Sequence, residues 1–120
     1  NTALGQSSSV CGGNGNLADG QFSTVAGGSN NDASGTTATV AGGVLNVAAG
    51  SSATVAGGEM NTAGNESTLS ATVLGGSQNI ATGDFATAAG GFDNVATGVF
   101  STVNGGKRND ASGNACERSG

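Results

Sequence analysis

The pentad Asn-x-Ala-x-Gly recurs eight times in this 120-residue chain, once with Asn65 in place of its glycine, and a second string, Ser/Thr-Val-x-Gly-Gly, lies between its copies. The pentads are 15 residues apart, except for one step of 18, and they begin at Asn1, Asn16, Asn31, Asn46, Asn61, Asn79, Asn94 and Asn109. So short and constant a period is typical of solenoids, in which a repeat cannot bury its own apolar face and packs on its neighbours. The sequence therefore predicts one stack of about eight coils over residues 1–113.

The composition narrows the kind of solenoid. Glycine supplies 24 of the 120 residues and proline is absent. Glycine without a three-residue period excludes collagen, and the lack of long amphipathic stretches excludes stacked helix pairs. Short segments rich in β-branched residues, such as 23–25 and 38–40, each end at Gly-Gly, as strands that lead into a tight turn do. We therefore expect an all-β fold with two short strands in each coil.

The repeats separate inward from outward positions. Alternation along a strand places one column of valines inside, namely Val25, Val40, Val55, Val73 and Val103, with Val10 and Ala88 at the equivalent positions. The residue two places earlier is always Ser or Ala, and the alanine of the pentad never varies, so we expect both inside as well. Larger apolar residues stand at positions that point outward and suggest self-association, namely Leu17, Leu45, Val47, Ile80, Phe92, Val95 and Phe100.

Two positions of the pentad suggest roles at a corner of the coil. The glycine is expected to need a positive φ, because the copy that departs from it has Asn65, the side chain most tolerant of the left-handed region. The asparagines are expected to form a structural ladder in which each amide satisfies backbone groups from coil to coil. This ladder would comprise Asn16, Asn31, Asn46, Asn61, Asn79, Asn94 and Asn109.

Two segments depart from the repeat. The three additional residues fall within residues 65–70, and we expect Asn65, Glu66, Ser67 and Thr68 to protrude, either as a tolerated bulge or as a binding loop. Residues 114–120 place the charged Arg118 where a valine should stand, which indicates a terminal cap or the start of a following segment. Cys11 and Cys116 lie seven coils apart, roughly 30 Å at about 4.8 Å per coil, too far for a disulfide within one continuous stack.

The repeated strings resemble a known family of surface proteins. The segment Ser23-Thr24-Val25-Ala26-Gly27-Gly28, followed by Asn31-Asp32-Ala33-Ser34-Gly35, is similar to repeats in the head domains of trimeric autotransporter adhesins, especially those of the ubiquitous surface protein type. The resemblance covers nearly the whole chain. It implies a left-handed parallel β-roll, a homotrimer, display at a bacterial cell surface, and an extracellular matrix or cell-surface ligand. Because the repeated residues are structural ones, the resemblance does not identify that ligand.

The residues that carry chemistry are sparse. The chain has no histidine, so its serine, threonine and cysteine side chains lack a general base, and we expect no enzymatic activity and no cofactor. The eight carboxylates occupy different positions of the repeat, which predicts no metal site. A net charge of −5 with three basic residues argues against binding to nucleic acid. The segment also has no apolar run long enough to span a bilayer, so no direct membrane contact is expected.

Two functions remain open from the sequence. The first is an adhesin head or fibre module that attaches to host matrix, host cells or other cells. The second is an ice-binding β-solenoid, because one outward column would repeat threonines along a flat face, namely Thr24, Thr39, Thr54, Thr72, Thr87 and Thr102.

Overall fold

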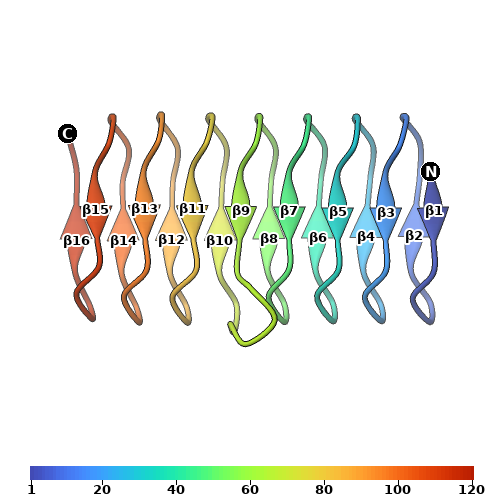
Figure 1. Ribbon diagram of the computed structural model, residues 1–120, viewed down its shortest axis with the longest axis horizontal. Helices are drawn as coiled ribbons and strands as arrows, with labels where there is room; N and C mark the ends of the chain where they lie inside the picture. Colours follow the sequence, from blue (N-terminus) through green and yellow to red (C-terminus); the bar gives the residue numbers. More distant parts are fainter.

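The computed structural model describes residues 1–120 and is a parallel β-solenoid of about eight turns (Figure 1). The stack measures 36 × 23 × 13 Å, with the chain termini at opposite ends of its long axis. It contains no helix, and therefore no helix that could cross a membrane. The prediction of an all-β stack with a period of about 15 residues is confirmed.

Each coil contributes one two-residue strand to each of two parallel sheets. Sheet A consists of β1 (Thr2–Ala3), β3 (Leu17–Ala18), β5 (Asp32–Ala33), β7 (Val47–Ala48), β9 (Thr62–Ala63), β11 (Ile80–Ala81), β13 (Val95–Ala96) and β15 (Asp110–Ala111). Sheet B consists of β2 (Ser9–Val10), β4 (Thr24–Val25), β6 (Thr39–Val40), β8 (Thr54–Val55), β10 (Thr72–Val73), β12 (Thr87–Ala88), β14 (Thr102–Val103) and β16 (Glu117–Arg118).

The strands pair in register, so that equivalent positions of neighbouring coils lie side by side. Thr39 of β6 pairs with Thr54 of β8, and Val40 pairs with Val55. Of the 77 backbone hydrogen bonds, 63 lie outside the short strands, and most of these run from one coil to the next. Stacking therefore satisfies the backbone of the turns as well as that of the strands.

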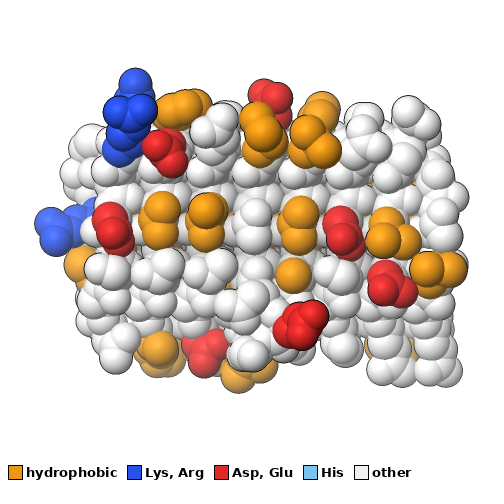
Figure 2. All heavy atoms as spheres, viewed as in Figure 1, with side chains coloured by type: hydrophobic (Ala, Val, Ile, Leu, Met, Phe, Trp, Pro, Cys, Tyr) orange, Lys and Arg blue, Asp and Glu red, His pale blue; other side chains and the backbone are white.

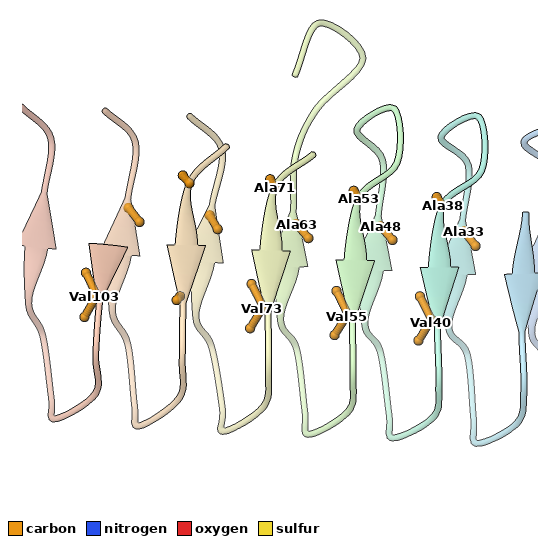
Figure 3. Close-up of a cluster of buried hydrophobic side chains, with 14 of the residues drawn as sticks. Ala33, Ala38, Val40, Ala48, Ala53, Val55, Ala63, Ala71, Val73 and Val103 are labelled. Carbon is orange, nitrogen blue, oxygen red and sulfur yellow. The ribbon is translucent and has the colours of Figure 1, made fainter. Parts of the chain in front are cut away.

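The core lies between the two sheets and is thin. Its 17 buried apolar side chains are all valine or alanine, and every one of them is fully buried (Figure 3). Val40 and Ala38 enter from sheet B, and Ala33 faces them from sheet A. Larger side chains would not fit a molecule only 13 Å thick, which explains why the repeat admits only small ones here.

A few inward positions deviate from the pattern. At the first coil Ala3 is exposed and Val10 is half-buried, because only one neighbouring coil covers them. Ser23 and Ser101 occupy inward positions where other coils have alanine, and their hydroxyl oxygens are buried without a hydrogen-bond partner. An unpaired buried hydroxyl typically costs about 1–3 kcal/mol, so these coils are locally weaker than those with alanine.

The expected role of the pentad glycine is wrong. Gly20 and Gly35 do not have positive φ; instead, a Cβ on Gly20 would overlap the carbonyl oxygen of Gly35 in the next coil. The glycine is needed because two backbones approach closely, not because of its left-handed conformation. The positive φ falls on the second glycine of each Gly-Gly, such as Gly28 at 89°.

Two further corners of the coil use the left-handed region without glycine, except that Gly15 occupies one of them in the first coil. Fourteen residues of this kind have φ between 52° and 59°, among them Phe22 at 58° and Thr37 at 56°. Such a conformation typically costs a non-glycine residue about 1–2 kcal/mol. A hydrogen bond to the preceding coil offsets the cost, since the Thr37 amide donates to the carbonyl of Gln21 at 2.7 Å.

The last coil continues the stack further than the sequence indicates. β16 pairs with β14, so that Glu117 lies beside Thr102 and Arg118 beside Val103. The strand pairing therefore passes residue 113, the predicted end of the roll. Arg118 is exposed although it lies in register with a buried valine.

Candidate functional surfaces

The asparagine column is a buried hydrogen-bond ladder. Asn46 is fully buried, and its backbone amide donates to Asn31 Oδ1 at 2.9 Å. Its side-chain Nδ2 donates to the carbonyl of Gly42, four residues earlier, and to that of Gly58, twelve residues later, both at 2.9 Å. Its Oδ1 in turn accepts from the Asn61 amide at 3.0 Å. The asparagines therefore stabilise a corner of every coil and are withdrawn from any ligand.

The predicted threonine face lies on sheet B. We use the name "sheet B face" for two outward columns of side chains. The first column is the threonines Thr24, Thr39, Thr54, Thr72, Thr87 and Thr102. The second column stands two residues later in each coil and comprises Ala26, Ala41, Ala56, Leu74, Ala89 and Asn104. The six threonines pair from strand to strand in register and are each half-buried by their neighbours. The face is flat and composed mostly of small side chains.

The opposite broad face is less uniform. We use the name "sheet A face" for the two corresponding columns on this side. The first is the outward column of sheet A, namely Thr2, Leu17, Asp32, Val47, Thr62, Ile80, Val95 and Asp110. The second stands two residues later in each coil and includes Leu4, Asp19, Ala49 and Thr97. Figure 2 views the molecule from this side, and acidic side chains interrupt its hydrophobic ones. Leu17, Val47 and Val95 are only partly exposed, whereas Ile80 is exposed.

Asp32 is the one ionisable group whose environment clearly perturbs it. It lies between Leu17 and Val47 in the sheet, and its Oδ1 is buried without a hydrogen-bond partner. Desolvation by burial raises the pKa of this carboxyl. Hydrogen bonding by the Ser34 side chain lowers the pKa, and the negative charge of Asp19 raises it further. The sequence shows an acidic residue in an apolar column but not that its oxygen lacks a donor.

The predicted loop protrudes below the stack between β9 and β10 (Figure 1). Asn65, Glu66 and Ser67 are exposed, and the Ser67 amide donates to Asn65 Oδ1 at 2.9 Å in a tight turn. Thr68 was expected among the protruding residues, but it is buried, and its Oγ1 donates to the Thr82 carbonyl at 2.9 Å.

The return point of this loop also corrects the role given to Asn65. The neighbouring residue Leu69 pairs with Ser51, so Thr68 lies next to Gly50 and takes the place of the pentad glycine in the stack. Asn65 lies in the loop and does not have positive φ; Gly64, where the chain leaves the coil, has φ 76°.

Exposed aromatic and aliphatic side chains gather on the narrow edges. Phe85 and Phe100 stack in parallel with their ring centroids 5.1 Å apart, and they remain 46% and 61% exposed. Phe85 and Phe100 are one 15-residue period apart, so the sequence predicts that the two rings stack once equivalent positions of adjacent coils are taken to lie side by side. On the other edge Lys107 Nζ lies 5.5 Å from the centroid of the Phe92 ring, and an exposed Arg108–Asp93 ion pair is worth little.

Side chains that could bind a metal ion are dispersed over the molecule, and its surface is not hollowed. No cluster of three or more His, Cys, Asp or Glu side chains could hold a metal ion, and the surface has no pocket. Cys11 is exposed and Cys116 half-buried, and both are free thiols. What the molecule offers a partner is therefore its two broad faces, its edges and one loop.

Comparison with known proteins identifies a related repeat family. Residues 23–35 match the ubiquitous surface protein adhesin repeat, and this segment contains β4 and β5 and has nearly the length of one coil. The adhesin repeat and the β-solenoid together fit a head or repeat domain of a trimeric autotransporter adhesin. No curated protein matches the chain.

Proposed function

We propose that this chain is a non-enzymatic adhesin module of a bacterial cell surface, assembled as a homotrimer, which attaches to host matrix, host cells or other cells. The observation that carries the proposal is the adhesin repeat at residues 23–35 within a solenoid built from equivalent coils. The module would act as a rigid block, because coil-to-coil hydrogen bonds join every coil to the next. Its specificity would come from outward side chains, since the inward ones are small and alike.

The proposal can be tested by bead adhesion. Fluorescent beads coated with the chain are applied to immobilised collagen, fibronectin and laminin and to epithelial cells, and the retained beads are counted. Beads coated with the heat-unfolded chain serve as the control. Retention on at least one of these surfaces by the folded chain alone supports an adhesin, whereas equal retention by both preparations on every surface contradicts it.

A matched variant tests whether the loop carries the binding. Deleting Asn65, Glu66 and Ser67 restores the 15-residue spacing, and Thr68→Gly restores the glycine that the close approach of two coils requires. This variant should fold as a regular stack. If it still adheres, the loop is a tolerated bulge; if it folds but no longer adheres, the loop is the contact.

Ice binding is a second candidate, favoured by the six threonines in register on sheet B. Successive threonines of this column lie about 4.8 Å apart and present methyl and hydroxyl groups in a regular row. The test is inhibition of ice recrystallisation by the wild type, compared with Thr54→Lys. Inhibition that is lost in the variant, with no adhesion by the wild type, would favour ice binding over adhesion.

A further inference from the structure

The three additional residues of the chain form a complete N-glycosylation sequon. Asn65, Glu66 and Ser67 read Asn-x-Ser, and removing them would restore the 15-residue spacing, so the sequon coincides with the insertion. We propose that Asn65 is the acceptor of an N-linked sugar, transferred from a donor that carries the sugar on a diphosphate. Such a modification is independent of whether the module adheres.

Asn65 is the one asparagine of the chain that has serine or threonine two residues later. The pentad asparagines have alanine at that position, as Asn46 has Ala48. The four asparagines outside the pentads other than Asn65 are followed there by Asn16, Asp32, Gly106 and Cys116. The repeat itself therefore offers a transferase no acceptor motif, and the insertion supplies one.

The side-chain amides of the ladder and of the loop differ in what they can react with. Asn46 is fully buried, and its Nδ2 already donates to two backbone carbonyls. Asn65 is exposed in the loop that protrudes between β9 and β10 (Figure 1), and its Nδ2 makes no hydrogen bond within the chain. An enzyme can therefore reach the amide nitrogen of Asn65 without opening the stack.

The sequon is held in a turn that lies outside the stack. The Ser67 amide donates to Asn65 Oδ1 at 2.9 Å, and the Thr68 amide donates to the Asn65 carbonyl at 3.0 Å. Thr68 is buried and anchors the turn, because its Oγ1 donates to the Thr82 carbonyl. Asn65, Glu66 and Ser67 are all exposed, so the turn presents the reacting amide and the serine of the motif together.

The reaction joins Asn65 Nδ2 to the anomeric carbon of the sugar. A C–N bond forms, the bond from that carbon to the diphosphate oxygen breaks, and the diphosphate leaves with the electron pair. Nδ2 loses one proton to a base of the transferase, and negative charge develops on Oδ1 as it leaves. The Ser67 amide already donates to Oδ1 and stabilises this charge.

Intact-mass spectrometry tests the proposal in two arms. In the first, the folded chain is incubated with UDP-glucose and a soluble, sequon-directed N-glucosyltransferase. In the second, it is incubated with a lipid-diphosphate oligosaccharide and a membrane oligosaccharyltransferase. We expect the mass of one hexose or of one oligosaccharide to be added, and peptide fragmentation to place it on Asn65. The arm that succeeds identifies the kind of donor.

Three substitutions within the loop test the assignment. Asn65→Gln should gain no sugar. Ser67→Ala should lower the modified fraction roughly 10-fold or more, because the transferase loses the hydroxyl that it recognises, whereas Ser67→Thr should retain the modification. Both changes at Ser67 keep the backbone amide that donates to Asn65, and circular dichroism shows whether each variant is folded.

A sequon placed in a regular coil provides the matched control. Asp32→Thr gives the exposed Asn30 a threonine two residues later, at a position where the equivalent coil has Thr62. The backbone here is held in the stack, since the Asn31 amide donates to Asn16 Oδ1 and the Asp32 amide to the Asn46 carbonyl. We expect Asn30 of this variant to stay unmodified in the folded chain and to accept sugar after heat unfolding.

Two results would overturn the proposal. The first is a folded wild type that carries no sugar on Asn65 in either arm. The second is equal modification of Asn30 and Asn65 in the folded Asp32→Thr variant, which would show that the loop does not select the acceptor. Bead adhesion of the unmodified chain is measured separately, so neither result bears on the proposed adhesive function.

Discussion

Replacing Asn46 by alanine should destabilise the fold far more than the loss of one polar side chain usually does. The variant loses the two bonds that Nδ2 donates to Gly42 and Gly58 and the bond that Oδ1 accepts from the Asn61 amide. Three hydrogen bonds at about 1 kcal/mol each, with about 1–3 kcal/mol more for the stranded Asn61 amide, predict a loss of about 4–6 kcal/mol in the free energy of unfolding.

Urea unfolding followed by circular dichroism measures this loss. Asn104→Ala is the control, because Asn104 is exposed and its side chain bonds only to the exposed Glu117, so we expect a loss below about 0.5 kcal/mol. Asn46→Asp keeps the acceptor Oδ1 but replaces the donating Nδ2 by an oxygen that faces two carbonyl oxygens. At neutral pH this substitution should lower the free energy of unfolding at least as much as Asn46→Ala does. If Asn46→Ala and Asn104→Ala lost the same stability, the reasoning about the ladder would be refuted.

Three further substitutions test inward, close-packed and titrating positions. Val40→Asp places a charge in the core and should cost about 4 kcal/mol or more, while Thr39→Val should remain within about 1 kcal/mol; equal loss of circular dichroism in both would contradict the two orientations. Gly35→Ala would overlap a carbonyl of the next coil and should cost about 3 kcal/mol, whereas Gly42→Ala meets no atom within 4 Å and should be neutral or slightly stabilising; equal melting temperatures would argue against close backbone approach. The raised pKa of Asp32 means that the folded state binds its proton more tightly than the unfolded state, so its contribution weakens the fold as pH rises from about 4 through the raised pKa. Asp32→Asn should remove that part of the pH dependence and be more stable than the wild type at pH 7; unchanged pH profiles would refute the effect.

Much of the fold follows from the period alone. Because each coil is the structural equivalent of the next, the columns of Val, Ala and Asn identify interior and ladder positions before any coordinates are known. The same logic places Thr54 and its equivalents on an outer face.

The period does not determine the geometry at a given position. From the sequence, Gly35 could be required either by a positive φ or by the close approach of another backbone segment. Only the spacing between coils shows that close approach is the reason. Bulky residues such as Phe22 and Thr37 in the left-handed region contradict local preference, and the coil-to-coil hydrogen bonds that offset this cost are tertiary. Asp32 differs from other carboxylates through its two strand neighbours, which no local pattern reveals.

Deletion of one complete period tests the central claim most directly, that position within a 15-residue coil determines the role of each residue. Removing residues 31–45 joins Asn30 to Asn46 and restores every column, whereas removing residues 31–44 shifts the junction by one residue and exchanges inward and outward side chains there. We predict that the first deletion unfolds cooperatively in urea with a midpoint near that of the wild type, and that the second loses most of this stability. Equal midpoints for the two deletions would contradict the account.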